Sequence, residues 1–229
     1  MKVVDLVFDP QRFSCTNTSE VTYKKGQDIY VVEQGEGFYY YVKKGFVKKY
    51  IISACGHELS LIIYRPGSLF SLSTLFCPNE NCFHYQAFSD TTLLKISHDV
   101  FIEKIFNDKD TLKVLCGRYT LGLNRVCQRL MQAYFSPAKN RVVSALCYFI
   151  KLFGTKNGNT IIFKLPLTHE DIAGIAGLSR ENTTRVLREL KRDNIIELSY
   201  RHIIIKKFTE FNNLNCKERH SLNNLSFPN

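Results

Sequence analysis

The spacing of apolar residues changes near residue 108, and this change restricts the possible folds more than any other feature of the chain. Before it, short β-branched and aromatic runs are separated by Gly26, Gly37, Gly45, Gly56 and Gly67. Short strands at regular intervals with glycine turns are typical of an antiparallel sandwich or barrel. After it, apolar residues recur at helical steps of three and four. The sequence therefore predicts an α+β protein in which a β domain precedes several helices.

Turn signals and β-rich runs define the first domain, which we assign to residues 1–107. Lys43-Lys44-Gly45 and Arg65-Pro66-Gly67 each predict a hairpin turn, because glycine accepts a positive φ and proline presets φ in the second case. Four runs around these turns are expected to be strands: Ile29–Val32, Phe38–Val42, Val47–Ile52 and Leu59–Tyr64.

A heptad pattern marks residues 108–136 as one long helix that ends at Ser136-Pro137. Its apolar positions, called the heptad stripe below, alternate in steps of four and three: Leu112, Cys116, Tyr119, Leu123, Val126, Leu130 and Ala133. Such a stripe is narrower than the face that a helix usually buries inside its own domain, so it favours pairing with a second copy across a two-fold axis. Packing of this helix on its own β domain is the alternative.

Helix start and stop signals recur in the third segment, residues 137–209. A helix over residues 138–153, closed by Gly154, precedes an Asn157-Gly158 hairpin turn. The runs Asn194–Leu198 and His202–Lys206 have the strand-turn-strand pattern of a wing. Residues 210–229 are weakly patterned and Asn-rich, and we expect a loose tail there.

Between these runs lies a helix-turn-helix pattern. Thr168 is a favourable N-cap with Asp171 in the capping-box position, and Gly177 ends the short helix that follows. Ser179 then caps a second helix. The apolar stripe of this second helix is Thr183, Val186, Leu187 and Leu190. Two short helices joined by a glycine turn predict a winged helix-turn-helix domain.

The front of the second helix carries the chemistry for reading DNA bases. An arginine can bond guanine O6 and N7 together, and Glu181 can accept from cytosine N4. Ser179, Thr168 and the helix N-termini suit phosphates, as do Arg201, Lys206 and Lys207 on the wing. The predicted DNA-binding residues are Thr168, His169, Ser179, Arg180, Glu181, Asn182, Thr184, Arg185 and Arg188.

The distribution of charge supports a polyanionic partner for the C-terminal part. Of the net charge of +10, residues 1–135 contribute +3 (16 basic minus 13 acidic), and residues 136–229 contribute +7 (15 minus 8). A basic excess confined to one segment is typical of a nucleic-acid-binding module. Double-stranded DNA is therefore the expected partner.

The remaining sequence features bear on membrane association, disulfide bonds and metal binding. No apolar run is long enough to cross a membrane, and the N-terminus fits neither a secretory signal nor a transit peptide, so we expect no membrane partner. None of the eight cysteines forms a Cys-x-x-Cys pair, and we expect them to be reduced. Cys77, Cys82 and His84 share one loop, but their spacing matches no zinc pattern, so no metal site is predicted.

The order of these segments resembles the Crp/Fnr superfamily of transcription regulators from end to end. Residues 178–187, Leu-Ser-Arg-Glu-Asn-Thr-Thr-Arg-Val-Leu, are similar to the recognition helix of the cyclic-AMP receptor proteins. The stretches 67–72 and 83–88 more closely resemble the cyanobacterial and plastid global nitrogen regulators. The resemblance implies a cyclic-nucleotide-binding-like β-roll, a dimerisation helix, and a homodimer that acts with RNA polymerase as an activator in nitrogen regulation.

The resemblance breaks at the effector site. Cyclic-nucleotide-binding members have Phe-Gly-Glu and then Arg-Ser or Arg-Thr, where this chain has Phe70-Ser71-Leu72 and Cys82-Phe83, so a cyclic nucleotide is not expected. The resemblance to nitrogen regulators implies a 2-oxoglutarate-like effector, although the β-roll arginine is replaced by Asn81. Arg118, Arg125 or Arg129 can substitute for it. The predicted effector residues are Phe70, Ser71, Leu72, Asn81 and Arg125.

Two alternatives to an effector-controlled regulator remain at this point. A constitutive DNA-binding dimer without an effector needs none of the missing ligand residues. A cupin-like metal enzyme needs a facial set of ligands, for which only His57, Glu58 and His84 are candidates, so we predict no enzyme activity. The excess of Phe, Tyr, Ile, Asn and Lys indicates an AT-rich genome and favours the plastid stroma, with a bacterial cytoplasm as the alternative.

Overall fold

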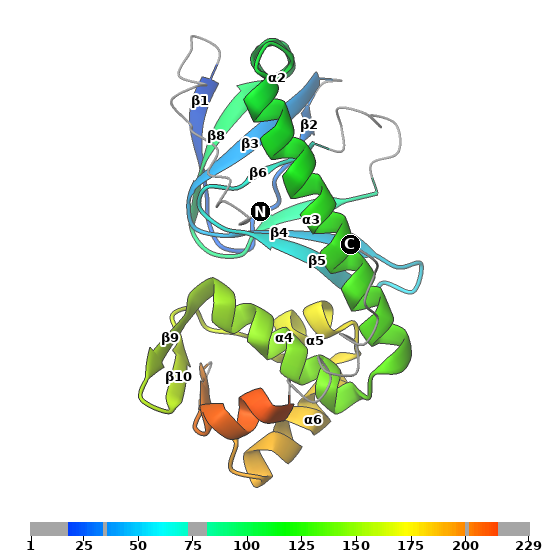
Figure 1. Cartoon of the computed structure of the whole chain (residues 1–229), viewed down its shortest axis with the longest axis vertical. Helices are drawn as coiled ribbons and strands as arrows, with labels where there is room; N and C mark the ends of the chain where they lie inside the picture. Colours follow the sequence, from blue (N-terminus) through cyan, green and yellow to red (C-terminus); the bar gives the residue numbers. More distant parts are fainter. Residues whose placement is uncertain (1–17, 34–35, 73–81, 200–201, 215–229) are drawn as a thin grey trace. The chain divides into compact units, whose positions relative to one another are not determined.

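A computed structural model describes residues 18–33, 36–72, 82–199 and 202–214 of the chain (Figure 1). The chain divides into two compact units, Met1–Gln128 and Arg129–Asn229. Each unit is described by itself. None of the helices in the described residues is long and apolar enough to cross a membrane.

Two antiparallel sheets form the first unit and confirm the predicted β-roll. The larger sheet has the order β1-β8-β3-β2, with β6 also paired to β3, and the smaller one has the order β5-β4-β7. Their strands are β1 (Thr18–Tyr23), β2 (Val32–Glu33), β3 (Glu36–Lys44), β4 (Val47–Ile52), β5 (Glu58–Tyr64), β6 (Leu69–Phe70), β7 (His84–Ala87) and β8 (Thr91–Ser97). The core between them is rich in aromatic rings, among them Tyr40, Phe70 and Tyr85.

The two predicted hairpins are wrong, although both turns exist. Gly45 and Gly67 adopt φ values of 82° and 87°. However, β3 and β4 belong to different sheets, and so do β5 and β6. Both turns are therefore corners at which the chain crosses between sheets. A Cβ on Gly45 would lie 2.3 Å from the carbonyl oxygen of Asp90, so only glycine fits this corner.

The predicted strand Ile29–Val32 is also wrong over most of its length. Only Val32 joins a strand there. The amide of Ile29 donates to the carbonyl of Tyr85, whereas the carbonyl of Val31 accepts from the amide of Phe38. The segment thus bonds first to β7 and then to β3. The side chains of Ile29 and Val31, which are 3% and 5% exposed, enter the core.

The long helix is confirmed as α3 (Lys109–Phe135), which follows the shorter α2 (His98–Phe106) (Figure 1). Within the first unit, Thr111 and Leu115 are its buried residues. Leu115 joins a core cluster with Phe101 of α2, whose ring stacks on that of Tyr39 at a centroid distance of 3.9 Å. These contacts use a different face of α3 from the heptad stripe.

The second unit has the predicted winged helix-turn-helix. It consists of α4 (Ala138–Phe153), β9 (Gly154–Asn157), β10 (Thr160–Phe163), α5 (His169–Ala176), α6 (Arg180–Arg192), β11 (Ile196–Ser199) and β12 (His202–Ile205), together with the last turns of α3. The strands form one antiparallel sheet in the order β11-β12-β10-β9. The wing therefore pairs with the Asn157-Gly158 hairpin, through β12 and β10.

The chain beyond Phe208 differs in part from the loose tail expected there. Residues 208–214 are helical, and the Phe211 side chain is fully buried. The amides of Phe208 and Thr209 donate to the carbonyl and the side-chain oxygen of Asn159, respectively. One apolar ring and these bonds hold the segment in place. The rest of the predicted tail, residues 215–229, lies outside the described residues.

Candidate nucleic-acid interface

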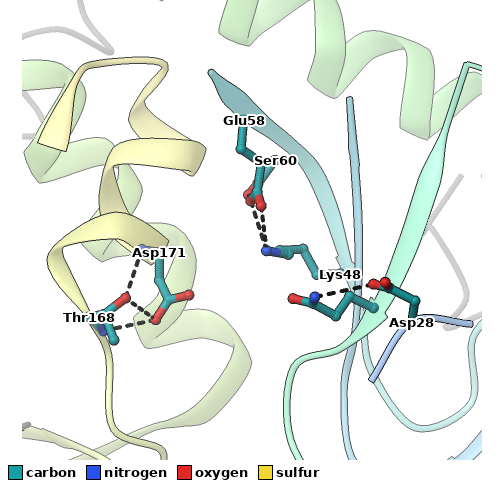
Figure 2. Close-up of polar contacts among 7 residues, drawn as sticks. Asp28, Lys48, Glu58, Ser60, Thr168 and Asp171 are labelled. Carbon is teal, nitrogen blue, oxygen red and sulfur yellow. Dashed lines mark hydrogen bonds and ion pairs between the residues drawn. The ribbon is translucent and has the colours of Figure 1, made fainter. Parts of the chain in front are cut away.

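The first helix of the helix-turn-helix begins at a complete capping box (Figure 2). The amide of Asp171 donates to Thr168 Oγ1 at 3.0 Å, and the amide of Thr168 donates to Asp171 Oδ2 at 2.8 Å. Two amides at the helix start, which lack partners within the helix, are thereby satisfied. The cap fixes the start of α5, as the sequence predicted.

The turn between α5 and α6 also follows the prediction. Gly177 ends α5 with φ 63° and ψ 41°, a left-handed conformation that glycine adopts without strain. Ser179 caps α6 by accepting from the amide of Asn182 at 3.2 Å. These two local signals fix the end of α5 and the start of α6.

One face of α6 packs on the second unit, and the opposite face is exposed. Its predicted apolar stripe is buried, namely Thr183, Val186, Leu187 and Leu190. The other face forms a shallow concavity lined by Arg180, Glu181, Thr184, Arg185, Arg188, Glu189 and Arg192. Arg180, Arg185 and Arg188 are exposed, as are Glu181 and Asn182. These five side chains have no ion pair or side-chain hydrogen bond within the described residues.

His169 joins the two helices at the edge of this face. Its Nδ1 lies 2.9 Å from Thr184 Oγ1. Burial, together with the positive charges of Arg180 and Arg188, lowers the pKa of His169 below its ordinary value of 6.5. The imidazole is therefore neutral in the free protein near neutral pH, next to arginines that carry the positive charge.

Two arginines that sequence reasoning did not assign to the DNA site hold the end of α5. Arg129 Nη2 donates to the carbonyl of Ile175 at 2.9 Å. Arg141 Nε donates to the carbonyl of Ala176 at 3.0 Å, and its Nη2 donates to the carbonyl of Gly177. Helix C-terminal carbonyls lack partners within the helix, so these guanidinium groups cap them. No sequence signal links Arg141 to a turn that lies 35 residues further along the chain.

An ion-pair network holds the C-terminal end of α6. Lys139 at the start of α4 lies 2.7 Å from Glu189 and 3.2 Å from Asp193. These hydrogen bonds raise the pKa of Lys139 above its ordinary value. Together with the arginine pair, this network holds the helix-turn-helix on α4 and on the end of α3.

The wing offers less free charge than predicted. Lys206 pairs with Glu197 at 2.9 Å, and Lys207 pairs with Glu210 at 3.2 Å. The Lys206 pair holds the pKa of Glu197 below its ordinary value. Arg201 lies outside the described residues.

The residues of the heptad stripe lie on the surface of the chain. Tyr119, Leu123 and Leu130 are 57% to 61% exposed, and Leu112 and Val126 are 36% and 45% exposed. Cys116 and Ala133 are exposed as well. The stripe is therefore not buried within the described part of the chain, and its pairing with a second copy stays a prediction.

The predicted effector residues are placed differently from one another. Phe70 is 1% exposed and stacks on Tyr85 at 5.2 Å, and the buried Ser71 hydroxyl donates to the Phe38 carbonyl. Because both side chains are buried and already make these contacts, only the backbone groups of Phe70 and Ser71 are available to an effector. Leu72 is half-buried and Arg125 is exposed, whereas Asn81 lies outside the described residues.

The substitutes considered for the missing arginine are engaged elsewhere. Arg118 donates from both Nη atoms to the carbonyl of Gly67, at 3.2 and 3.3 Å. Arg129 holds α5, as described above. Cys82 and His84 are exposed, Cys77 is outside the described residues, and the described part of the chain has no cluster of metal-binding side chains.

Comparison with known proteins matches both parts of this architecture. Residues 20–108 match the cyclic nucleotide-binding domain, and residues 140–214 match the Crp-like helix-turn-helix domain. The global nitrogen regulator of Nostoc is 26% identical over 81% of this chain and 84% of its own length. The lactate racemization regulatory protein of Lactiplantibacillus plantarum is 25% identical over 81% of this chain and 86% of its own length.

A solved structure has the same fold. It is that of a Crp/Fnr-family transcriptional regulator of Thermus thermophilus, with a TM-score of 0.72, 26% identity, and coverage of 86% of this chain and 98% of the other. The relatives are regulators and not enzymes. The chain belongs to the Crp/Fnr family and is a DNA-binding transcriptional regulator with a cyclic nucleotide-binding domain followed by a Crp-like helix-turn-helix.

Proposed function

We propose that two copies of the chain bind a palindromic DNA site, each with its α6 in the major groove. The observation that carries this proposal is the exposed face of α6, on which Arg180, Arg185, Arg188 and Glu181 make no ion pair and no side-chain hydrogen bond within the described residues. An ion pair within the chain would order these long side chains and use their charged groups. Without such a pair, the charged groups stay available to a ligand. Their availability suits contact with an external ligand that offers both acceptors and donors.

The chemistry of this face fits base edges. Arg180 and Arg185 lie near the N-terminal end of α6, where helix-turn-helix proteins contact the major groove. Each arginine can bond one guanine at O6 and N7, and each such contact discriminates against a wrong base by about 1–3 kcal/mol. Glu181 between them accepts from a cytosine amino group. The three side chains together select one short sequence.

The other predicted residues suit the DNA backbone. Thr168 and Ser179 stand at helix N-termini, where amides and the helix dipole favour phosphate. Arg188 lies on the exposed face of α6, beyond the reading trio, while His169 and Thr184 bond to each other at its edge. Asn182 is exposed in the first turn of α6. These groups set the register of α6 in the groove without reading sequence.

The exposed heptad stripe supports the homodimer. A long apolar stripe in water costs free energy that a twin stripe removes on pairing. Such a dimer is expected to read two half-sites about 34 Å apart, one turn of DNA. The dimer therefore reads a palindrome.

The physiological role is proposed from resemblance. We infer nitrogen control, activation through RNA polymerase and a plastid location, supported by the β-roll stretches 67–72 and 83–88, the nitrogen regulator of Nostoc and the AT-rich composition. A 2-oxoglutarate-like effector belongs to the same proposal. Footprinting on a selected site with and without 2-oxoglutarate tests it, and an unchanged footprint contradicts the effector.

Site selection from random DNA tests the DNA-reading proposal. We expect the wild-type protein to select a palindrome, and Arg180→Ala and Arg185→Ala each to lose preference at one symmetric guanine position. Lys164→Ala, which removes an exposed charge of the second unit outside α6, is the matched control. Wild-type selection of no sequence, or unchanged base preference in both arginine variants, contradicts the proposal.

A further inference from the structure

The middle of α3, residues 119–128, has little support within the first unit and is called the free span below. Leu115 and Arg118, just before it, contact the core and a backbone carbonyl of the β-roll. No residue of the free span is buried. Among the described residues, its one side-chain hydrogen bond runs from Thr120 Oγ1 to the carbonyl of Cys116 in the same helix. Within this unit, the helix there depends on its own residues.

The free span also contains several residues with low helix propensity. Gly122 lies near its centre, where the position of a Cβ has no atom within 4 Å, so packing does not require a glycine. Glycine destabilises a helix relative to alanine, and Thr120, Asn124 and Val126 are less favourable as well. A short helix in water gains too little from its own hydrogen bonds to be fully formed. The free span is therefore expected to open in a single copy unless another surface covers it.

The heptad stripe, which crosses the free span, offers only a modest apolar core to a second copy. Three of its positions are leucines, Leu112, Leu123 and Leu130, whereas Cys116 and Ala133 bury little apolar surface. Stable paired helices have large aliphatic residues along the whole seam. The stripe therefore supports pairing, but not tight pairing.

The charges beside the stripe oppose pairing. Residues 111–135 of α3 contain no acidic residue, and their basic residues are Lys113, Arg118, Arg125 and Arg129. Of these, Lys113 Nζ lies 3.6 Å from Asp110 Oδ1 at the start of the helix. Opposite charges beside the seam favour the pairing of two helices, and like charges oppose it. Two copies of α3 side by side therefore repel each other through these side chains.

We propose that two copies of the chain are largely separate in solution and pair through α3 on the DNA site. Pairing in solution must fold the free span and bring like charges together, in return for a modest apolar seam, so the net gain is small. On a palindrome the two copies are held next to each other, which raises the effective concentration of the second stripe. This inference rests on the dimer of the proposed function and names the condition under which it forms.

Pairing can be measured without DNA and with it. Sedimentation velocity of the full chain under reducing conditions should show monomers below about 1 μM protein, as expected for a weak pair. Added sodium chloride should strengthen the pair, because it screens the repulsion between the basic side chains. Fluorescence anisotropy on a selected palindrome should give a Hill coefficient of about 2, and a single half-site should give a coefficient of about 1.

Two substitutions in the free span test the folding step. Gly122→Ala should strengthen pairing in solution about fivefold, because the helix then costs less free energy to form. It should also lower the protein concentration that half-saturates the palindrome. Asn124→Ala should act in the same direction by a smaller factor. The matched control is Asn212→Ala, which raises helix propensity at an exposed position of the helical residues 208–214 and should leave pairing unchanged.

The outcomes separate this inference from the proposed function. A wild-type dimer that persists at nanomolar concentration overturns the inference. It is also overturned if Gly122→Ala and Asn124→Ala leave pairing unchanged or weaken it. Binding to the palindrome as a monomer at every protein concentration would instead contradict the dimer of the proposed function.

Discussion

Thr183 is the one apolar-stripe position of α6 that carries a hydroxyl. Its side chain is fully buried, and Oγ1 has no hydrogen-bond partner among the described groups. A buried unpaired hydroxyl costs about 1–3 kcal/mol, so Thr183→Val is expected to raise the free energy of unfolding by about 1 kcal/mol. Urea denaturation measures this change.

The adjacent Thr184 provides the control for Thr183. Its hydroxyl bonds to His169, so Thr184→Val removes a made hydrogen bond and is expected to lower stability. DNA affinity of Thr183→Val should stay unchanged, because that side chain faces the core. A destabilised Thr183→Val protein would show that the hydroxyl is satisfied in solution.

We expect His169 to make DNA binding depend on pH. Its pKa is lowered in the free protein, first by burial and then by Arg180 and Arg188, and phosphates near the start of α5 favour the imidazolium form. DNA binding is therefore expected to raise the pKa of His169, so that affinity increases as pH falls from the pKa of the bound state towards the lower pKa of the free protein, by at most about tenfold per pH unit. Protein stability has the opposite sign, because the unfolded chain takes up this proton at higher pH than the folded one.

Fluorescence anisotropy between mildly acidic and neutral pH measures the His169 effect. His169→Gln should flatten the dependence, whereas His57→Gln, an exposed histidine of the other unit, should keep it. An unaltered profile in His169→Gln would assign the pH dependence to another group.

At the level of helices and strands, the features that can be predicted from the sequence are those set by residues close together in the chain. Thr168 and Gly177 mark the start and the end of α5, and Ser179 marks the start of α6, because caps act within one turn of chain. The hairpin predicted at Gly45 is wrong because a glycine specifies a turn but does not specify which strands pair on either side of it. Here β3 pairs with β8, and β4 pairs with β5. Strand pairing depends on distant residues, and so does the arginine pair that caps α5.

The arginine pair at the end of α5 gives a prediction about geometry rather than charge. Arg129→Lys and Arg141→Lys keep the charge but replace the planar guanidinium, so the carbonyls of Ile175 and Gly177 lose their donors. The turn before α6 then loosens, and discrimination between the selected site and random DNA should fall about tenfold, the effect of about one hydrogen bond. Competition binding measures the ratio.

The salt dependence of binding separates this effect from direct phosphate contact. Neither arginine is expected to neutralise a phosphate, so the slope of log affinity against log salt should stay constant in both variants. Arg192→Lys, at the exposed C-terminal end of α6, is the matched control. Reduced slopes with intact discrimination would mean that these arginines bind DNA themselves.

Over the whole molecule, charge and apolar surface are separated. The basic excess lies in residues 136–229, and the exposed heptad stripe lies on α3. A basic module for DNA and an apolar helix for the proposed second copy need different surfaces, so this separation allows one chain to carry both. The sequence revealed both surfaces, because periodicity and net charge do not depend on knowing the fold.

Cys116 within the heptad stripe allows a direct test of the dimer. Residues of such a stripe face their own twins across the axis of a parallel pair, at separations that a disulfide can bridge. Mild oxidation of the reduced protein should therefore give a covalent dimer on a non-reducing gel. Cys116→Ser should abolish the band, whereas Cys127→Ser, which removes an exposed thiol of the same helix outside the stripe, should retain it. If the cross-link instead required Cys127, the helices would meet through another face of α3, and the dimer proposed through the heptad stripe would be wrong.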